Sequence, residues 1–197
     1  MPPLDPPARI PQLSPADFDD ETKAFFDRWT VGPFKNADKN PPLLTYAHHP
    51  KLADLFSQLN IHLLLTNTVP VKQRQIAIMR TAWLCKSVYM WSSHLNTSLS
   101  FGLDPEMFRP IQAGADDPYF TAFERVIIQA TDELVEDRKI SDGNWEILAK
   151  EWSHPQLLDF MFTVGTYVLT AGVMRSTGVQ REPDLIALAE IYGAPQP

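Results

Sequence analysis

Apolar residues recur at steps of three and four along nearly every segment of this 197-residue chain, and no segment alternates apolar and polar residues for more than a few positions. Steps of three and four place side chains on one face of an α-helix, whereas a half-buried strand needs strict alternation. The chain is therefore predicted to be all-α. At this length it forms one domain, which buries roughly 70% of the surface that the unfolded chain exposes.

Prolines and capping residues mark where the helices begin. Proline suits a first helical position because its nitrogen has no hydrogen to leave unbonded there. Helices are expected over residues 14–29, 43–48, 51–66, 104–112, 119–136, 141–152, 155–178 and 183–192, with a central helical stretch from 70 to 102. Within 51–66, the interior face is expected to hold Leu52, Leu55, Phe56, Leu59 and Leu63.

The first twelve residues contain five prolines and are expected to form an extended arm. The domain organisation is thus a proline-rich arm over residues 1–13 and a helical domain over 14–197. The arm has no apolar core of a signal peptide, and no stretch nears the ~20 apolar residues of a membrane span. We therefore expect a soluble, cytoplasmic protein that does not bind a membrane.

Charge and cysteine content exclude further classes of function. Seventeen basic and 24 acidic residues give a net charge of −7, without a basic run that could bind a polyanion, so nucleic acid is not an expected partner. The single cysteine, Cys85, rules out an intramolecular disulfide and cycling of a local dithiol. A buried thiol is the expected state of Cys85.

Residues that could do chemistry are concentrated in the central stretch. Helical spacing places Ser87, Met90, Trp91 and His94 on one side, whereas Tyr89 points to another side, roughly 200° from Trp91. We expect Trp91, rather than Tyr89, to share a pocket with His94. Ser87 lies roughly 10 Å along the axis from His94, too far to be activated by it directly, so it either binds a ligand or fills a small packing site.

These residues resemble the motif of the carboxymuconolactone decarboxylase family, which includes the alkylhydroperoxidase D-like proteins. The peroxidase branch carries a glutamate, a CxxC pair and a histidine, positions that fall here on Gln75, Ser87, Met90 and His94. A second branch has a Ser-Glu-Tyr-Glu-Trp run before the histidine, where this chain has Ser87 to Trp91 with both glutamates replaced. Further runs similar to this branch are residues 137–142 and 162–167.

The resemblance implies an alkylhydroperoxidase D-like helical bundle, assembled as a dimer, trimer or hexamer. The departures from the motif imply the loss of two chemistries. Without the CxxC pair, peroxide reduction in its usual form is not expected, and a residual peroxidase through Cys85 is the least favoured alternative. Without the motif glutamates, the usual carboxylate bases of the decarboxylase-like branch are missing.

His94 remains as the candidate catalytic residue, because imidazole exchanges protons near neutral pH. The alternative for His94 is a hydrogen-bonded core histidine. His48, His49 and His94 could converge on a metal ion, but no spaced carboxylates complete such a site, so neither a metal nor a cofactor is expected.

Three further polar side chains are candidates for substrate binding, in addition to Ser87, Tyr89, Met90 and Trp91. Arg80 is seven residues before Ser87 and is expected on the same helix face, where it could bind a carboxylate or enolate oxygen, although an ion pair with another helix is favoured slightly. Arg175 stands where similar proteins often have an asparagine, and could accept an anionic ligand. Tyr167 needs a partner for its hydroxyl in an apolar helix, either a ligand oxygen or a backbone carbonyl.

Together these residues predict a cofactor-free lyase or isomerase with His94 as general acid or base. Its substrate would be a small hydrophobic oxygenated compound, such as a biosynthetic intermediate, that undergoes decarboxylation, dehydration, enol isomerisation or cyclisation. The alternative is a non-catalytic member of the family that has lost the motif and binds a ligand or partner. An open pocket beside His94 favours the enzyme, and a cavity filled by side chains favours the binding protein.

Overall fold

The structure is a computed structural model that describes residue 5 and residues 7–30 and 36–196. This part of the chain is helical and contains no strand, as predicted. The helices are α1 (Asp20–Trp29), α2 (Pro41–Tyr46), α3 (Pro50–Ile61), α4 (Val71–Leu84), α5 (Val88–Ser100), α6 (Phe108–Ala113), α7 (Ala122–Glu136), α8 (Asp142–Glu151), α9 (His154–Thr177) and α10 (Pro183–Tyr192).

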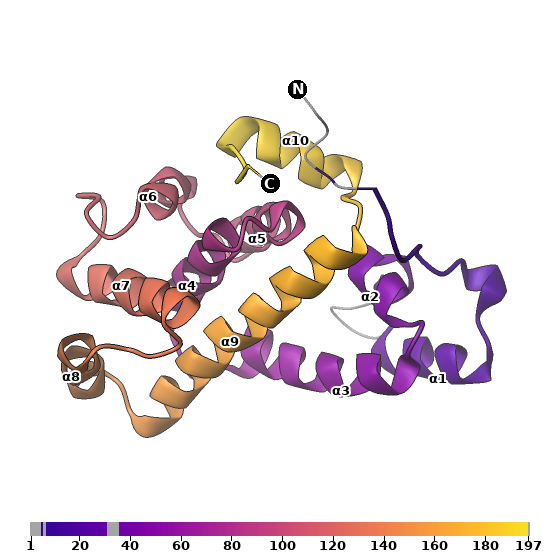
Figure 1. The fold of residues 1–197 in the computed structure, drawn as a ribbon, viewed down its shortest axis with the longest axis horizontal. Helices are drawn as coiled ribbons and strands as arrows, with labels where there is room; N and C mark the ends of the chain where they lie inside the picture. Colours follow the sequence, from indigo (N-terminus) through magenta and orange to yellow (C-terminus); the bar gives the residue numbers. More distant parts are fainter. Residues whose placement is uncertain (1–4, 6, 31–35, 197) are drawn as a thin grey trace.

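The buried apolar residues form a main core and a separate N-terminal cluster. The main core is built on α4, which packs against α5, α7 and α9, and its largest side chains include Trp91, Phe108 and Phe160. The N-terminal cluster joins α1, α2 and α3 through Phe25, Phe26 and their neighbours. In Figure 1 the long helix α9 crosses the molecule, with α1 to α3 on one side and α6 to α8 on the other.

Side-chain caps fix several helix starts. The Thr121 and Ser153 hydroxyls and the side chains of Glu124 and Gln156 form reciprocal capping boxes, which satisfy backbone N–H groups left free at the first turn. The first predicted helix is wrong at its start. The chain makes one 3₁₀ turn at 15–17, extends, and enters α1 only after Asp19 caps the Thr22 N–H at 2.8 Å.

The central stretch is divided into α4 and α5 by a turn at residues 85–87. Lys86 has a φ of 54°, in the left-handed region, which ends the first helix and changes the direction of the chain. Residues on the two sides of this turn no longer share one helical register. The face that the sequence predicted for Arg80 together with Ser87 is therefore absent.

Two helices expose apolar side chains, and those of α3 were predicted to lie inside. In α3 the exposed residues are Leu52, Leu55 and Leu59, because the opposite face, with Ala53 and Ser57, is the buried one. In α9, Leu158, Phe162 and Leu169 are 53%, 58% and 60% exposed. Among the described residues, α9 is the one helix with the length and composition of a membrane span, contrary to the expectation of none. A core helix of a globular protein can have the same length and composition, and α9 packs on α4.

The described part of the N-terminal arm is extended and held against the helical body. The backbone N–H groups of Arg9 and Ile10 donate to the Thr177 carbonyl, and Asp5 forms an ion pair with Arg181 at 2.8 Å. Gly178, with a φ of 72°, lies so close to the Pro7 carbonyl that a Cβ atom would collide with it. Residues 1–4 and 6 of the predicted arm lie outside the described part of the chain.

Candidate functional site

A cavity of about 290 Å³ opens between the N-terminal cluster and the main core, and His94 lies in its wall. We call the lining residues of α5 and α9 the bundle wall and those of residues 29–64 the N-terminal wall. The bundle wall consists of Tyr89, Met90, Ser93, His94, Thr97, Tyr167, Thr170 and Met174. The N-terminal wall consists of Trp29, Asn36, Ala37, Asn40, Pro42, Leu43, Tyr46, Phe56, Ser57, Asn60, Ile61 and Leu64.

Gln75 of α4 holds the ring of His94 from behind. Its side-chain oxygen lies 2.9 Å from His94 Nδ1 and also accepts a hydrogen bond from the Ser98 hydroxyl at 3.3 Å. Because an amide oxygen can only accept, the nitrogen that faces it carries the hydrogen. The other nitrogen, Nε2, therefore keeps its lone pair, and no side chain in the described part of the chain donates a hydrogen bond to it.

Burial keeps the His94 ring neutral. The side chain is 7% exposed, and loss of water around the imidazolium, together with the positive charge of Arg74, lowers the pKa of His94 to about 3. Its partner Gln75 is uncharged and cannot offset this effect, as a glutamate at that position would. His94 therefore presents a neutral imidazole throughout the physiological pH range.

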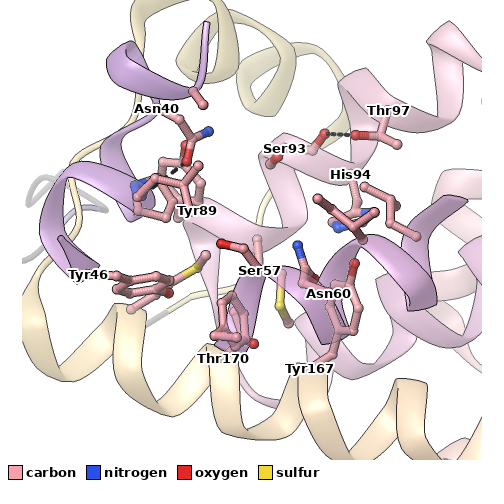
Figure 2. A pocket seen from close by; sticks show the side chains of 18 of the residues that line it. Asn40, Tyr46, Ser57, Asn60, Tyr89, Ser93, His94, Thr97, Tyr167 and Thr170 are labelled. Atoms are coloured by element: carbon pink, nitrogen blue, oxygen red, sulfur yellow. Dashed lines mark hydrogen bonds between the residues drawn. The ribbon is translucent and has the colours of Figure 1, made fainter. Parts of the chain in front are cut away.

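Tyr167 and Asn60 come close to His94 from the other elements. The Tyr167 ring packs edge-to-face on the His94 ring with centroids 5.1 Å apart. In Figure 2 the side chains of Asn60, His94 and Tyr167 point toward one another, although they come from α3, α5 and α9. Burial raises the pKa of the Tyr167 hydroxyl, which therefore remains a proton donor. One hydrogen-bond acceptor and two donors thus converge at this end of the cavity.

Four of the residues predicted for the site line the cavity: Tyr89, Met90, His94 and Tyr167. The prediction that Trp91, rather than Tyr89, shares a pocket with His94 is wrong. Tyr89 lines the cavity, whereas Trp91 is fully buried in the main core and its indole N–H donates to the Gly193 carbonyl at 2.8 Å. Tyr89 also packs against Val179 and Leu185, and its hydroxyl donates to Glu182 at 3.3 Å.

Three other predicted residues lie away from the cavity. Arg80 forms the ion pair that was the favoured alternative, with Nε 2.7 Å from Asp132, and it donates two further bonds to backbone carbonyls. Arg175 donates to the Cys85 carbonyl at 3.0 Å. Ser87 is buried before α5, and its hydroxyl has no hydrogen-bond partner in the described part of the chain.

The N-terminal wall and the hydrogen-bond partner of His94 were not predicted from the sequence. The sequence did contain a signal that Gln75 belongs to the site. Gln75 occupies the motif position of the glutamate and is a polar residue on an otherwise apolar helix face. No such signal exists for Tyr46, Ser57 and Asn60, since nothing in their local spacing indicates that α2 and α3 lie opposite α5. Only long-range packing brings them to His94.

Neither a metal cluster nor a reactive thiol completes the site. The described residues include no group of three or more His, Cys, Asp or Glu side chains placed to hold a metal ion. His48, a candidate metal ligand from the sequence, is exposed, and its Nε2 lies 2.8 Å from the Pro11 carbonyl oxygen. Burial raises the pKa of the Cys85 thiol, which ends α4 outside the cavity lining.

Comparison with solved structures shows which fold this is. An uncharacterised peroxidase-related protein from Ralstonia eutropha JMP134, with an alkylhydroperoxidase AhpD core, has a TM-score of 0.76 at 14% identity over 91% of this chain and 95% of its own. A peroxidase-related protein from Silicibacter sp. TM1040 has a TM-score of 0.69 at 17% identity over 100% of both chains. The chain therefore has the AhpD-like fold.

A third neighbour of this fold is an enzyme. A cysteine-to-alanine variant of the debrominase Bmp8, in complex with 2,3,4-tribromopyrrole, has a TM-score of 0.74 at 11% identity over 95% of this chain and 99% of its own. By sequence alone, no family profile and no curated protein matches the chain.

Proposed function

We propose that this chain with the AhpD-like fold is a cofactor-free lyase or isomerase in which His94 moves a proton on a small oxygenated compound. The observation that carries the proposal is the free Nε2 of His94 beside an open cavity. The ring is neither turned to solvent nor enclosed by side chains, since it is 7% exposed and lines a space of about 290 Å³. The debrominase neighbour adds that this fold can hold a small flat ring.

The chemistry begins with removal of a proton from the carbon beside a carbonyl group. His94 Nε2 takes the proton, the electrons of the C–H bond form an enolate, and the enolate oxygen accepts hydrogen bonds from the Tyr167 hydroxyl and the Asn60 amide. The imidazolium then returns the proton, either to another carbon in an isomerisation or to a departing hydroxyl group in a dehydration. No redox change and no external reagent is needed.

The low pKa of His94 makes stabilisation of the enolate essential. A weak base removes a proton only if the anion formed is stabilised in the same step, as donors placed at an oxyanion do. The buried charge of Arg74, which disfavours the imidazolium in the free protein, favours the enolate. His94, Tyr167 and Asn60 are therefore proposed to act as one unit.

Proton exchange tests this function without knowledge of the natural substrate. With 2-tetralone, a neutral ketone with acidic C–H groups, the protein in D₂O is expected to speed deuterium uptake, followed by NMR. His94→Asn should reduce the rate by about 10²–10⁴-fold, the usual contribution of a general base. His62→Asn, which changes a histidine outside the cavity lining, is the control. Equal rates for His94→Asn and wild type would exclude His94 as the base.

One observation favours the alternative, a protein that binds a ligand without converting it. A pKa of about 3 makes His94 a good neutral hydrogen-bond acceptor and a weak base. In that case the protein would bind 2-tetralone, by calorimetry, without any increase in deuterium uptake. Binding accompanied by exchange would exclude this second function.

We further propose that the chain self-associates in the cytoplasm as a homo-oligomer. Support comes from the exposed apolar residues of two helices, in α3 Leu52, Leu55 and Leu59, and in α9 Leu158, Phe162 and Leu169. Their spacing places each set on one side of its helix, and exposed apolar patches of this kind favour protein contacts.

A further inference from the structure

The lining of the cavity carries no formal charge in the described part of the chain. Its residues are apolar or neutral, His94 is uncharged because its pKa is lowered to about 3, and burial raises the pKa of the hydroxyls of Tyr46, Tyr89 and Tyr167. Arg74, whose charge acts on His94, is not among the lining residues. An ionised ligand would lose its water here without gaining a charged partner in the lining, which weakens its binding.

The polar groups of the lining fall into two kinds. The hydroxyls of Thr97 and Thr170 already donate to carbonyls of their own helices, at 3.0 and 2.7 Å. The hydroxyls of Tyr46 and Ser57 are buried and have no hydrogen-bond partner in the described part of the chain. A buried hydroxyl without a partner is costly, and a ligand oxygen would remove that cost.

These unpartnered groups lie away from the proton-transfer end. In Figure 2, Tyr46 and His94 are at opposite sides of the view and Ser57 is between them. Ser57 and Asn60 are three residues apart on α3, so they are neighbours on one face and connect the two ends. Apolar side chains, which include Phe56, Met90 and Met174, also line the cavity.

We propose that the ligand is an uncharged, flat compound with an oxygen function at each end, such as a hydroxylated ketone or phenol. One oxygen is bound by Asn60 and Tyr167 beside His94, and the other by Tyr46 and Ser57. A volume of about 290 Å³ is at the lower edge of ligand pockets, which suits one or two fused rings. This proposal rests on the proposed function only for the end of the ligand that reacts beside His94. Because the ligand is uncharged, free carboxylic acids are not expected as substrates.

Calorimetry with matched naphthalene compounds tests this ligand class. At about pH 7, 2,6-dihydroxynaphthalene is expected to bind more tightly than 2-naphthol, and 6-hydroxy-2-naphthoate to bind about tenfold more weakly than its methyl ester, because only the acid is charged. The double variant Tyr46→Phe with Ser57→Ala should lower the affinity for 2,6-dihydroxynaphthalene by about three- to tenfold, to that of 2-naphthol. Tyr119→Phe with Thr131→Val removes matched hydroxyls outside the cavity lining and should change neither affinity.

The outcomes separate the ligand class from the proposed reaction. Equal affinity for the naphthoate and its ester, or no binding of any probe at about 1 mM, would overturn the uncharged ligand. An unchanged affinity for 2,6-dihydroxynaphthalene in the double variant would overturn the two-ended arrangement. The same titrations on His94→Asn protein should keep the preference for the ester. That preference would stand even if deuterium exchange proved independent of His94.

Discussion

The two walls of the cavity differ in what they contribute. The bundle wall carries His94 and Tyr167, held by the main core and by Gln75 behind the ring. The N-terminal wall carries neutral amides and hydroxyls, of which Tyr46 and Ser57 lack a partner within the described chain. Under the proposed function, the bundle wall carries the base His94, Asn60 of the N-terminal wall assists it, and Tyr46 and Ser57 of the N-terminal wall bind the other end of the ligand. Changes in the two walls should therefore affect different measurements.

The largest expected effect comes from weakening the core behind the bundle wall without altering its surface. Arg80→Ala leaves the Asp132 carboxylate and the carbonyls of Ile111 and Gln112 without their donors. The free energy of unfolding should therefore fall by about 3 kcal/mol. Urea denaturation measures this loss. Arg28→Ala, which breaks an exposed ion pair with Asp54, is the control and should cost less than about 1 kcal/mol.

The affinity of folded Arg80→Ala protein for 2-naphthol should equal that of the wild type. A loss of affinity larger than about tenfold would show that Arg80 belongs to the binding site, which was the less favoured of its two predicted roles.

A change of charge beside His94 should alter the pH dependence of deuterium exchange. Because the pKa of His94 is about 3, wild-type exchange with 2-tetralone should be flat between about pH 5 and 8. Gln75→Glu places a carboxylate beside Nδ1–H, which favours the imidazolium and raises the pKa of His94. The variant should then be slow at acid pH, by about tenfold or more, and rise through the neutral range as His94 loses its proton.

Gln75→Leu is the matched variant without a charge or a hydrogen bond, and should leave the profile flat while lowering the rate. A flat profile in Gln75→Glu would mean that Gln75 does not control the protonation of His94.

The smallest expected effect concerns the N-terminal wall and has opposite signs in the free and bound states. Ser57→Ala removes a buried hydroxyl without a partner, so the free protein should gain roughly 0.5–1 kcal/mol of stability, while 2,6-dihydroxynaphthalene should bind a few-fold more weakly. Thermal and urea unfolding measure the first effect and calorimetry the second. Lower stability in Ser57→Ala would indicate that Ser57 serves packing and not ligand binding.

The sequence predicted the bundle wall of the cavity better than the N-terminal wall. Helical spacing and the motif placed His94 and Met90 on one face, and both line the cavity. The same reasoning chose Trp91 over Tyr89, because it could compare positions on α5 but could not tell which side another segment would cover. Arg80 was expected in the register of Ser87, and the turn at Lys86, with its positive φ, removed that relation.

The sequence by itself determined the helices, most of their starts and the histidine, because spacing, capping and proline geometry act over a few residues. Tertiary structure alone decided that α3 and α9 enclose His94, that Gln75 sets its tautomer, and that its pKa is far below the usual value. These properties depend on contacts between segments far apart in the chain and on the exclusion of water, which no local pattern records.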